Sequence, residues 1–148
     1  MLFSLESRRR RGLLWSVVAV ASIQWMGVVA VRGEGDARRW KAPARAARFR
    51  NPVSADAKSL AAGKALYARE CVSCHGEGGR GNGPDAADLS RPPADFKAPA
   101  VAGQADGELF WKLTEGNKPM PRYGRMLSED DRWNLVNYIR SIEGSGSR

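Results

Sequence analysis

The hydrophobic pattern of the chain after Pro52 is helical. Apolar residues recur there at intervals of three and four positions, the spacing that places side chains on one face of a helix. No stretch alternates apolar and polar residues as a half-buried strand does, and no segment repeats. The pattern therefore predicts an all-α domain.

Three main helices are expected from start and stop signals around these apolar positions. The first begins at Ser54 or Asp56, both suitable N-cap residues, and runs toward Cys71. The second is capped by Asp106 and ends at Gly116, and the third begins with Ser128 followed by Asp131 in a capping-box-like pattern. The apolar positions that define them are Leu60, Leu66, Tyr67, Leu109, Phe110, Trp111, Leu113, Trp133, Leu135, Val136, Tyr138, Ile139 and Ile142.

Glycine and proline mark the remaining segments. Five glycines between Gly76 and Pro84 predict a turn-rich loop, and the prolines at 92, 93 and 99 predict an extended stretch after it. Gly63 lies inside the first helix, where glycine costs about 1 kcal/mol relative to alanine. That cost indicates a packing reason for the glycine.

The N-terminal segment, residues 1–33, has the features of a signal peptide or a membrane anchor. Four arginines at positions 8–11 precede the uncharged run 12–31, which is about long enough to span a bilayer. Cleavage after Gly33 is one outcome, although no A-x-A site lies there; we favour a retained anchor. In either case the arginines stay on the cytoplasmic side, so the rest of the chain is exported.

Charge is unevenly distributed along the chain. Residues 1–50 carry 11 Lys or Arg and 3 Asp or Glu, whereas residues 51–148 carry 13 of each, so the net charge of +8 lies wholly in the first part. Residues 34–52 are expected to form a basic, Ala- and Pro-containing linker, either lying against anionic headgroups or solvated without a partner. The folded domain is expected at 53–144, with a flexible tail at 145–148. Its neutrality argues against nucleic-acid binding.

The stretch that says most about the chemistry of the protein is Cys71-Val72-Ser73-Cys74-His75. Two thiols three residues apart can add to the two vinyl groups of one haem, and the following histidine then becomes an iron ligand. A thioredoxin-like pair would need a βαβ context, and a zinc site would need further Cys or His ligands that this sequence lacks. The motif therefore predicts covalent haem attachment.

Together, these features resemble the class I c-type cytochromes of bacteria over about residues 54–143. That family has a helix leading into C-x-x-C-H, a Gly-rich loop, a short middle helix, a loop with an axial Met, and a last helix that crosses the first. Gly63 and Tyr67 match the glycine and aromatic of the family's first helix, and Tyr138 matches the aromatic of the crossing helix. Pro84 is similar to the proline whose carbonyl accepts the Nδ1–H of the proximal histidine. The resemblance implies a cytochrome c-like all-α fold around one covalently attached haem c.

Few residues of this sequence can serve as the second axial ligand. His75 is the only histidine, so the thioethers of Met120 and Met126 are the donors that remain outside the N-terminal segment. Met120 stands between Pro119 and Pro121, which should hold its loop stiff and extended, and it matches the family's Met-Pro loop. Met126 is expected in the core or over a haem edge. An open iron or one bound by lysine is the other alternative.

His75 and Met120 as axial ligands would leave no open site on the iron, which suits outer-sphere electron transfer. The resemblance therefore implies a periplasmic one-electron carrier and not an enzyme. Its expected partners are a respiratory dehydrogenase, a quinol-oxidising complex or a terminal oxidase or reductase. The alternative is a haem-bearing electron-inlet subunit or domain of a larger oxidoreductase complex. A peroxidase-like or gas-binding protein is disfavoured because no distal histidine is available.

Overall fold

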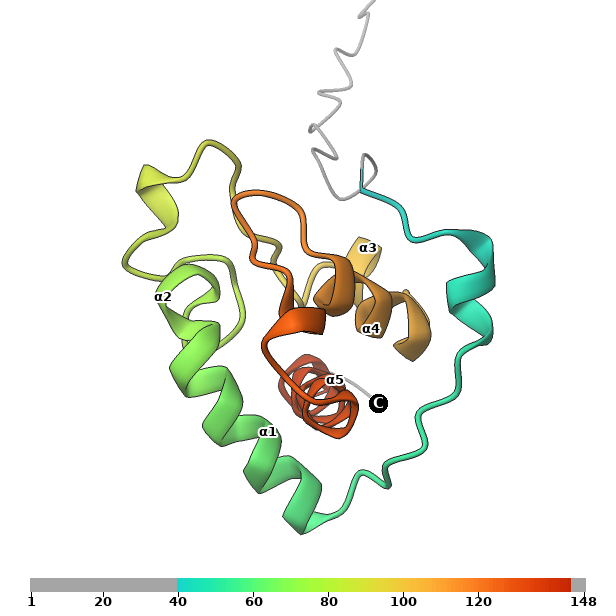
Figure 1. Cartoon of the computed structure of the whole chain (residues 1–148). Coiled ribbons are helices and arrows are strands. Elements are labelled where there is room, and N and C mark those ends of the chain that lie inside the picture. Colours follow the sequence, from blue (N-terminus) through green and yellow to red (C-terminus); the bar gives the residue numbers. More distant parts are fainter. Residues whose placement is uncertain (1–39, 145–148) are drawn as a thin grey trace, which may run out of the picture. The chain divides into compact units, whose positions relative to one another are not determined.

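The computed structural model describes residues 40–144 (Figure 1). The described residues belong to one unit of the chain, Arg32–Arg148. The predictions for residues 1–33 and 145–148 therefore lie outside the described residues. The elements in chain order are η1 (Ala44–Arg48), α1 (Ala57–Glu70), α2 (Val72–His75), η2 (Ala86–Asp88), α3 (Pro99–Ala102), α4 (Asp106–Glu115), η3 (Tyr123–Arg125) and α5 (Glu129–Gly144). Between residues 40 and 144 there is no β-strand, and the expected all-α class is confirmed.

Helix α1 begins as the sequence predicts and leads directly into the Cys-His motif. The Asp56 side chain is its N-cap and accepts a hydrogen bond from the Ser59 backbone N–H at 2.8 Å. Asp56, and not Ser54, therefore starts this helix. Helix α2 follows after the single residue Cys71.

Helices α1 and α5 cross at Gly63. A Cβ built on Gly63 would lie 2.1 Å from the Asn134 carbonyl oxygen and 2.8 Å from the Tyr138 Cβ, so only glycine allows the backbones to approach this closely. Beside the crossing, the Ser59 hydroxyl donates to Asn134 Oδ1 at 2.7 Å and accepts from Asn137 Nδ2 at 2.9 Å. The predicted packing reason for Gly63 is thus the helix crossing, which Figure 1 shows with α5 viewed along its axis.

Helix α4 packs against α5 and ends at Gly116 as expected, but its start differs from the prediction. Ala105 is the N-cap, and the Glu108 side chain accepts a hydrogen bond from the Ala105 backbone N–H at 2.8 Å. Asp106, the predicted cap, is instead the first helical residue and pairs with Arg140 Nε of α5 at 2.7 Å. Arg140 thereby fixes the start of α4 against α5.

Pro99 also differs from the prediction of an extended stretch. It is the first residue of the short helix α3, a position where proline is favoured because its missing N–H has no helical partner to lose. The short helix η2 lies upstream of this stretch.

The segment 40–52, part of the predicted linker, is packed against the helical domain, so the alternative of a solvated spacer is wrong for these residues. Ala46 in η1 is completely buried, and a Cβ on Gly107 of α4 would meet its carbonyl oxygen at 2.1 Å. Trp40 packs against Trp111, with 6.4 Å between ring centroids, and the Asn51 side chain donates to Asn137 Oδ1 at 2.7 Å. The folded domain therefore includes residues upstream of the predicted boundary at 53.

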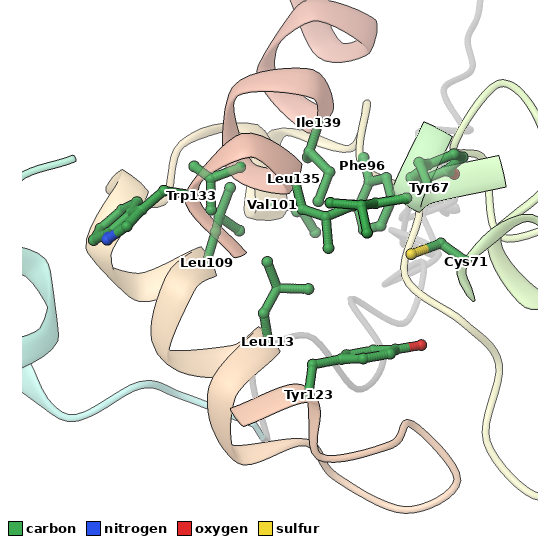
Figure 2. Packing of buried hydrophobic residues seen from close by; sticks show 12 residues of the cluster. Tyr67, Cys71, Phe96, Val101, Leu109, Leu113, Tyr123, Trp133, Leu135 and Ile139 are labelled. Carbon is green, nitrogen blue, oxygen red and sulfur yellow. The ribbon is translucent and has the colours of Figure 1, made fainter. Parts of the chain in front are cut away.

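The core is a single cluster of buried apolar side chains from α1, α4, α5 and the loops between them (Figure 2). Its members are Leu66, Tyr67, Cys71, Phe96, Val101, Leu109, Leu113, Tyr123, Trp133, Leu135, Val136 and Ile139. Cys71 belongs to this cluster, so the Cys-His motif borders the core. Among residues 40–144, no helix is both long and apolar enough to cross a membrane.

Candidate functional site

Helix α2 brings Cys74 and His75 together with Cys71, which immediately precedes it. Cys71 is 7% exposed and Cys74 is half-buried, and both thiols are free rather than joined in a disulfide. The two cysteines are separated by one helical turn, so their sulfurs lie on the same side of the helix. In Figure 2 the Cys71 sulfur points toward the rest of the core cluster.

The Cys71 thiol is in an environment that does not favour the thiolate. Burial, with smaller effects from Glu70 and Cys74, raises the pKa of Cys71 to about 12. A redox-active dithiol needs a lowered pKa on its attacking cysteine, so this environment argues against a thioredoxin-like pair. A buried neutral thiol remains compatible with a structural, covalently attached cofactor.

His75 is held at one edge and on one face of its ring. Its Nδ1 lies 3.1 Å from the Ala94 carbonyl oxygen, and the Phe96 ring stacks on the imidazole with 4.5 Å between centroids and 18° between planes. The carbonyl partner means that Nδ1 carries the proton and donates. Burial lowers the pKa of His75, which favours the neutral imidazole that binds metals. Nε2 makes no hydrogen bond with residues 40–144 and is available as a ligand.

The proline expected to accept the His75 hydrogen bond is not its partner in the structure. Pro84 is exposed, and the carbonyl within reach of Nδ1 belongs to Ala94. The difference follows from the stacking of Phe96, which brings the segment containing Ala94 against the imidazole. No pattern in the sequence points to Ala94, because a backbone carbonyl can come from any residue.

The glycine-rich loop after His75 satisfies the free carbonyls at the end of α2. The backbone N–H groups of Gly81, Gly83 and Asp85 donate to the carbonyls of His75, Cys74 and Ser73 at 2.9, 3.0 and 2.9 Å. The last carbonyls of a helix lack partners within the helix, so this loop acts as a backbone cap. A Cβ on Gly83 would lie 2.2 Å from the Ser73 carbonyl oxygen, which explains the glycine.

Met120 lies in a tight turn and not in the extended loop that the sequence predicts. Asn117 and Met120 exchange two backbone hydrogen bonds of 3.1 and 3.0 Å, and the Lys118–Pro119 peptide between them is cis. A cis proline at this position of a turn closes the chain on itself. Met120 is half-buried and packs against the core cluster.

The Met120 loop is connected to the Cys-His motif through Tyr123. The Tyr123 hydroxyl donates to the Glu70 carbonyl oxygen at 2.8 Å, and Glu70 is the residue before Cys71. At the base of the loop, Arg122 pairs with Glu115 at 2.6 Å. On the other side of the motif, the buried Tyr67 hydroxyl donates to the Gly76 carbonyl oxygen at 2.7 Å.

Met126, the other thioether donor, is 59% exposed. Of the two expected positions, the core is therefore wrong, and a position over a haem edge stays a prediction. Met120 differs from it in packing against the core cluster, on the loop that Tyr123 connects to the end of α1.

The donor set fits a covalently attached haem. Two unpaired thiols lie three residues apart, and an imidazole with a free Nε2 follows them. A thioether lies in a loop that Tyr123 joins to the end of α1, directly before the first of these cysteines. Cys71, Cys74, His75 and Met120 are the residues that would hold it. Phe96 and Ala94 were not among the predicted site residues; an aromatic shortly after two prolines was the only signal for Phe96.

This arrangement agrees with a family comparison. Residues 58–139, more than half of the chain, match the family described as cytochrome c oxidase, cbb3-type, subunit III. The chain belongs to this family and is a c-type cytochrome. A cytochrome c domain carries electrons through covalently bound haem c, so the domain matched at residues 58–139 is an electron carrier and not itself an enzyme.

One solved structure is also similar. A chain of the reducing HAO-like protein complex of Kuenenia stuttgartiensis aligns with a TM-score of 0.57 and 32% identity. The alignment covers 62% of this chain and 46% of the other, so this protein matches slightly less than half of that chain's length.

Proposed function

We propose that the protein is a periplasmic one-electron carrier with a single haem c, attached through Cys71 and Cys74 and ligated axially by His75 and Met120. The bound haem supplies the one-electron redox couple. The observation that carries the proposal is that His75 has a free Nε2 while the Met120 loop is joined through Tyr123 to Glu70, the residue directly before Cys71.

Each proposed ligand has a role that follows from its position. Cys71 and Cys74 fix the cofactor to the end of α1 and to α2, so binding survives even where enclosure is incomplete. His75 is oriented by its contacts with Ala94 and Phe96. Met120 closes the second axial position, which excludes substrates from the iron and leaves electron transfer as the reaction.

The proposed location is the periplasmic face of the inner membrane, with residues 12–31 as a retained anchor. The support from the structure is the charge of the docked segment that follows. Four exposed cations, Lys41, Arg45, Arg48 and Arg50, make no ion pair with residues 40–144, and the exposed ring of Phe49 lies among them in sequence. Exposed cations next to an aromatic suit an anionic membrane surface.

Met120→Ala tests the ligand assignment. We expect this change to remove the weak red absorption band of oxidised Met-ligated haem, to lower the reduction potential and to open the ferrous iron to CO. Met126→Ala is the matched control, since Met126 is exposed, and it should leave all three unchanged. Loss of the band in Met126→Ala alone would reject Met120 as the ligand, and a parent protein that binds CO without showing the band would reject the closed-iron carrier.

Membrane fractionation tests the location. The haem should remain in the membrane pellet after a high-salt wash and be released by detergent. A released form that begins near residue 34 would show a cleaved signal in place of an anchor.

A second candidate function is an electron-inlet subunit of a larger oxidoreductase complex. It is favoured by the similarity to a chain of a multi-protein complex and by the family description as a subunit. Gentle detergent extraction followed by size-exclusion chromatography with haem detection separates the two. Elution of the haem at the mass of the single chain supports the carrier, and stable co-elution with other polypeptides supports the subunit.

A further inference from the structure

We propose that the segment Pro93–Phe96 orients His75, with the Ala94 carbonyl fixing its Nδ1–H and the Phe96 ring fixing its plane. These are positioning residues, because they would act on the iron only through the imidazole. The inference rests on the proposed function, in which His75 is an axial ligand. In this proposal the Ala94 carbonyl takes the place of the Pro84 carbonyl that the sequence predicts.

The contacts restrain two separate motions of the imidazole. The 3.1 Å contact between Nδ1 and the Ala94 carbonyl oxygen fixes the tautomer and the direction of one ring edge. The stacked Phe96 ring opposes rotation of the imidazole about its Cβ–Cγ bond. A hydrogen bond at the far nitrogen also raises the basicity of a metal-ligating histidine.

Phe96 is itself rigidly placed. It is 9% exposed, its backbone N–H donates to the Gly79 carbonyl oxygen at 2.8 Å, and its ring meets Tyr67 edge-on with 6.3 Å between centroids. Figure 2 shows Phe96 beside Tyr67 at the same end of the core cluster as Cys71. A side chain held on several sides can transmit its position to the ring stacked on it.

Two glycines leave room for this segment. A Cβ on Gly81 would lie 2.4 Å from the Pro93 carbonyl oxygen, and a Cβ on Gly79 would lie 2.8 Å from the Phe96 ring. Both residues have positive φ, 71° and 69°, which disfavours any other side chain. The glycine-rich loop thus has a second role besides capping α2, since it receives the segment that contacts His75.

Asp95 shapes the bend between the two contacting residues. Its Oδ1 accepts a hydrogen bond from the Lys97 backbone N–H at 2.8 Å, a local turn typical of aspartate. Asparagine can make the same bond, whereas alanine cannot. Asp95 therefore offers a way to loosen the segment without changing any residue that touches His75.

The first test replaces the stacked ring in the haem-loaded full-length protein. Phe96→Leu should change the pattern of haem methyl shifts in the paramagnetic NMR spectrum, which reports the plane of the axial imidazole, and should shift the reduction potential. Phe110→Leu is the matched control. Phe110 stacks on Trp133, with 3.9 Å between centroids, and makes no ring contact with His75. The control should lose stability and keep the parent's NMR pattern and potential.

Asp95→Ala and Asp95→Asn decide the question if Phe96→Leu fails to fold. Asp95→Ala should shift the methyl pattern and Asp95→Asn should restore it. A parental methyl pattern in Asp95→Ala, and in any Phe96→Leu that folds, would overturn the inference, as would an equal shift in Phe110→Leu. Failure of the proposed function is distinct, because the parent protein would then lack the Met-dependent red band whatever the variants show.

Discussion

The two segments that carry the proposed iron ligands are held in different ways. The Cys-His segment is fixed along its length, by the backbone donors of the glycine-rich loop on one side and by Ala94 and Phe96 on the other. The Met120 turn is closed by its own two backbone hydrogen bonds between Asn117 and Met120, and side-chain bonds of Arg122 and Tyr123 tie it to the rest of the domain. The Cys-His segment thus meets other segments through close backbone contacts, whereas the Met120 turn is tied to the segments outside its own loop by side-chain bonds that can be removed one at a time.

This difference matters for a redox site because substitutions near the two iron ligands should then have different effects on folding and on ligation. Substitutions that add atoms beside the Cys-His segment should lower the stability of the whole fold. Substitutions around Met120 should leave a folded protein whose second ligand is less firmly held. Four substitutions test this contrast.

The largest effect is expected from Gly83→Ala. The new Cβ would lie 2.2 Å from the Ser73 carbonyl oxygen and 2.5 Å from that of Val72, and backbone atoms cannot move away cheaply. We expect a loss of about 3 kcal/mol in the free energy of unfolding, measured by denaturant titration of the haem-loaded protein. Gly78→Ala is the control. Apart from its two neighbours in the chain, no residue of the described part, 40–144, has an atom within 4 Å of a Cβ at Gly78, so its effect should stay within about 0.5 kcal/mol. Equal costs at the two glycines would contradict a tightly fitted loop.

Tyr67→Phe should have the next largest effect. Tyr67 is 2% exposed, and removing its hydroxyl leaves the Gly76 carbonyl oxygen with the Gly79 backbone N–H as its remaining donor. We expect a cost of about 1.5 kcal/mol in denaturant unfolding. The Met-dependent red band should remain, since the bond lies on the Cys-His side. Loss of the band in this variant would mean that the two ligand segments are not independent.

Tyr123→Phe removes the corresponding bond on the Met120 side. The cost should be about 1 kcal/mol, because the hydrogen bond to the Glu70 carbonyl is only partly buried. The red band should disappear at a lower temperature than in the parent, well before the helices unfold by circular dichroism. Simultaneous loss of band and helicity at the parent's temperature would argue against Tyr123 as the connection.

Arg122→Gln should have the smallest effect. The pair of Arg122 and Glu115 is largely exposed, with side-chain exposures of 53% and 39%, so solvent and salt screen it. We expect a loss of about 0.5 kcal/mol at low salt that shrinks as salt is added. A loss independent of salt would indicate that the Arg122 bond to the Glu115 backbone carbonyl, at 2.9 Å, is the more important contact.

Much of the helical framework could be predicted because it depends on local signals. Asp56 and Ser128 accept hydrogen bonds from the backbone at the starts of α1 and α5, and Gly116 ends α4. Gly63 was recognisable since a glycine inside a helix has a propensity cost that packing must offset. These features are encoded by a residue type at a fixed position.

The parts that the sequence did not reveal depend on backbone atoms or on a single small side chain. Any residue could supply the carbonyl that Ala94 provides. The docking of residues 40–52 rests in part on Ala46, which is buried although the charged residues near it suggest a solvated linker. The cis Pro119 turn was likewise not encoded by proline alone, because most prolines are trans.

The docking of residues 40–52 also limits how far the domain can travel from a membrane. Had the whole basic region been free, the distance between the apolar run and the domain would have been set by residues 32–52. With Trp40 packed against Trp111, only residues 32–39 remain between them, and even fully extended they reach about 29 Å at most. If residues 12–31 stay in the bilayer as proposed, the domain is tethered at Trp40 within that distance of the lipid surface. Its redox partners must then come to it, and membrane-bound complexes lying in the same plane are within its range.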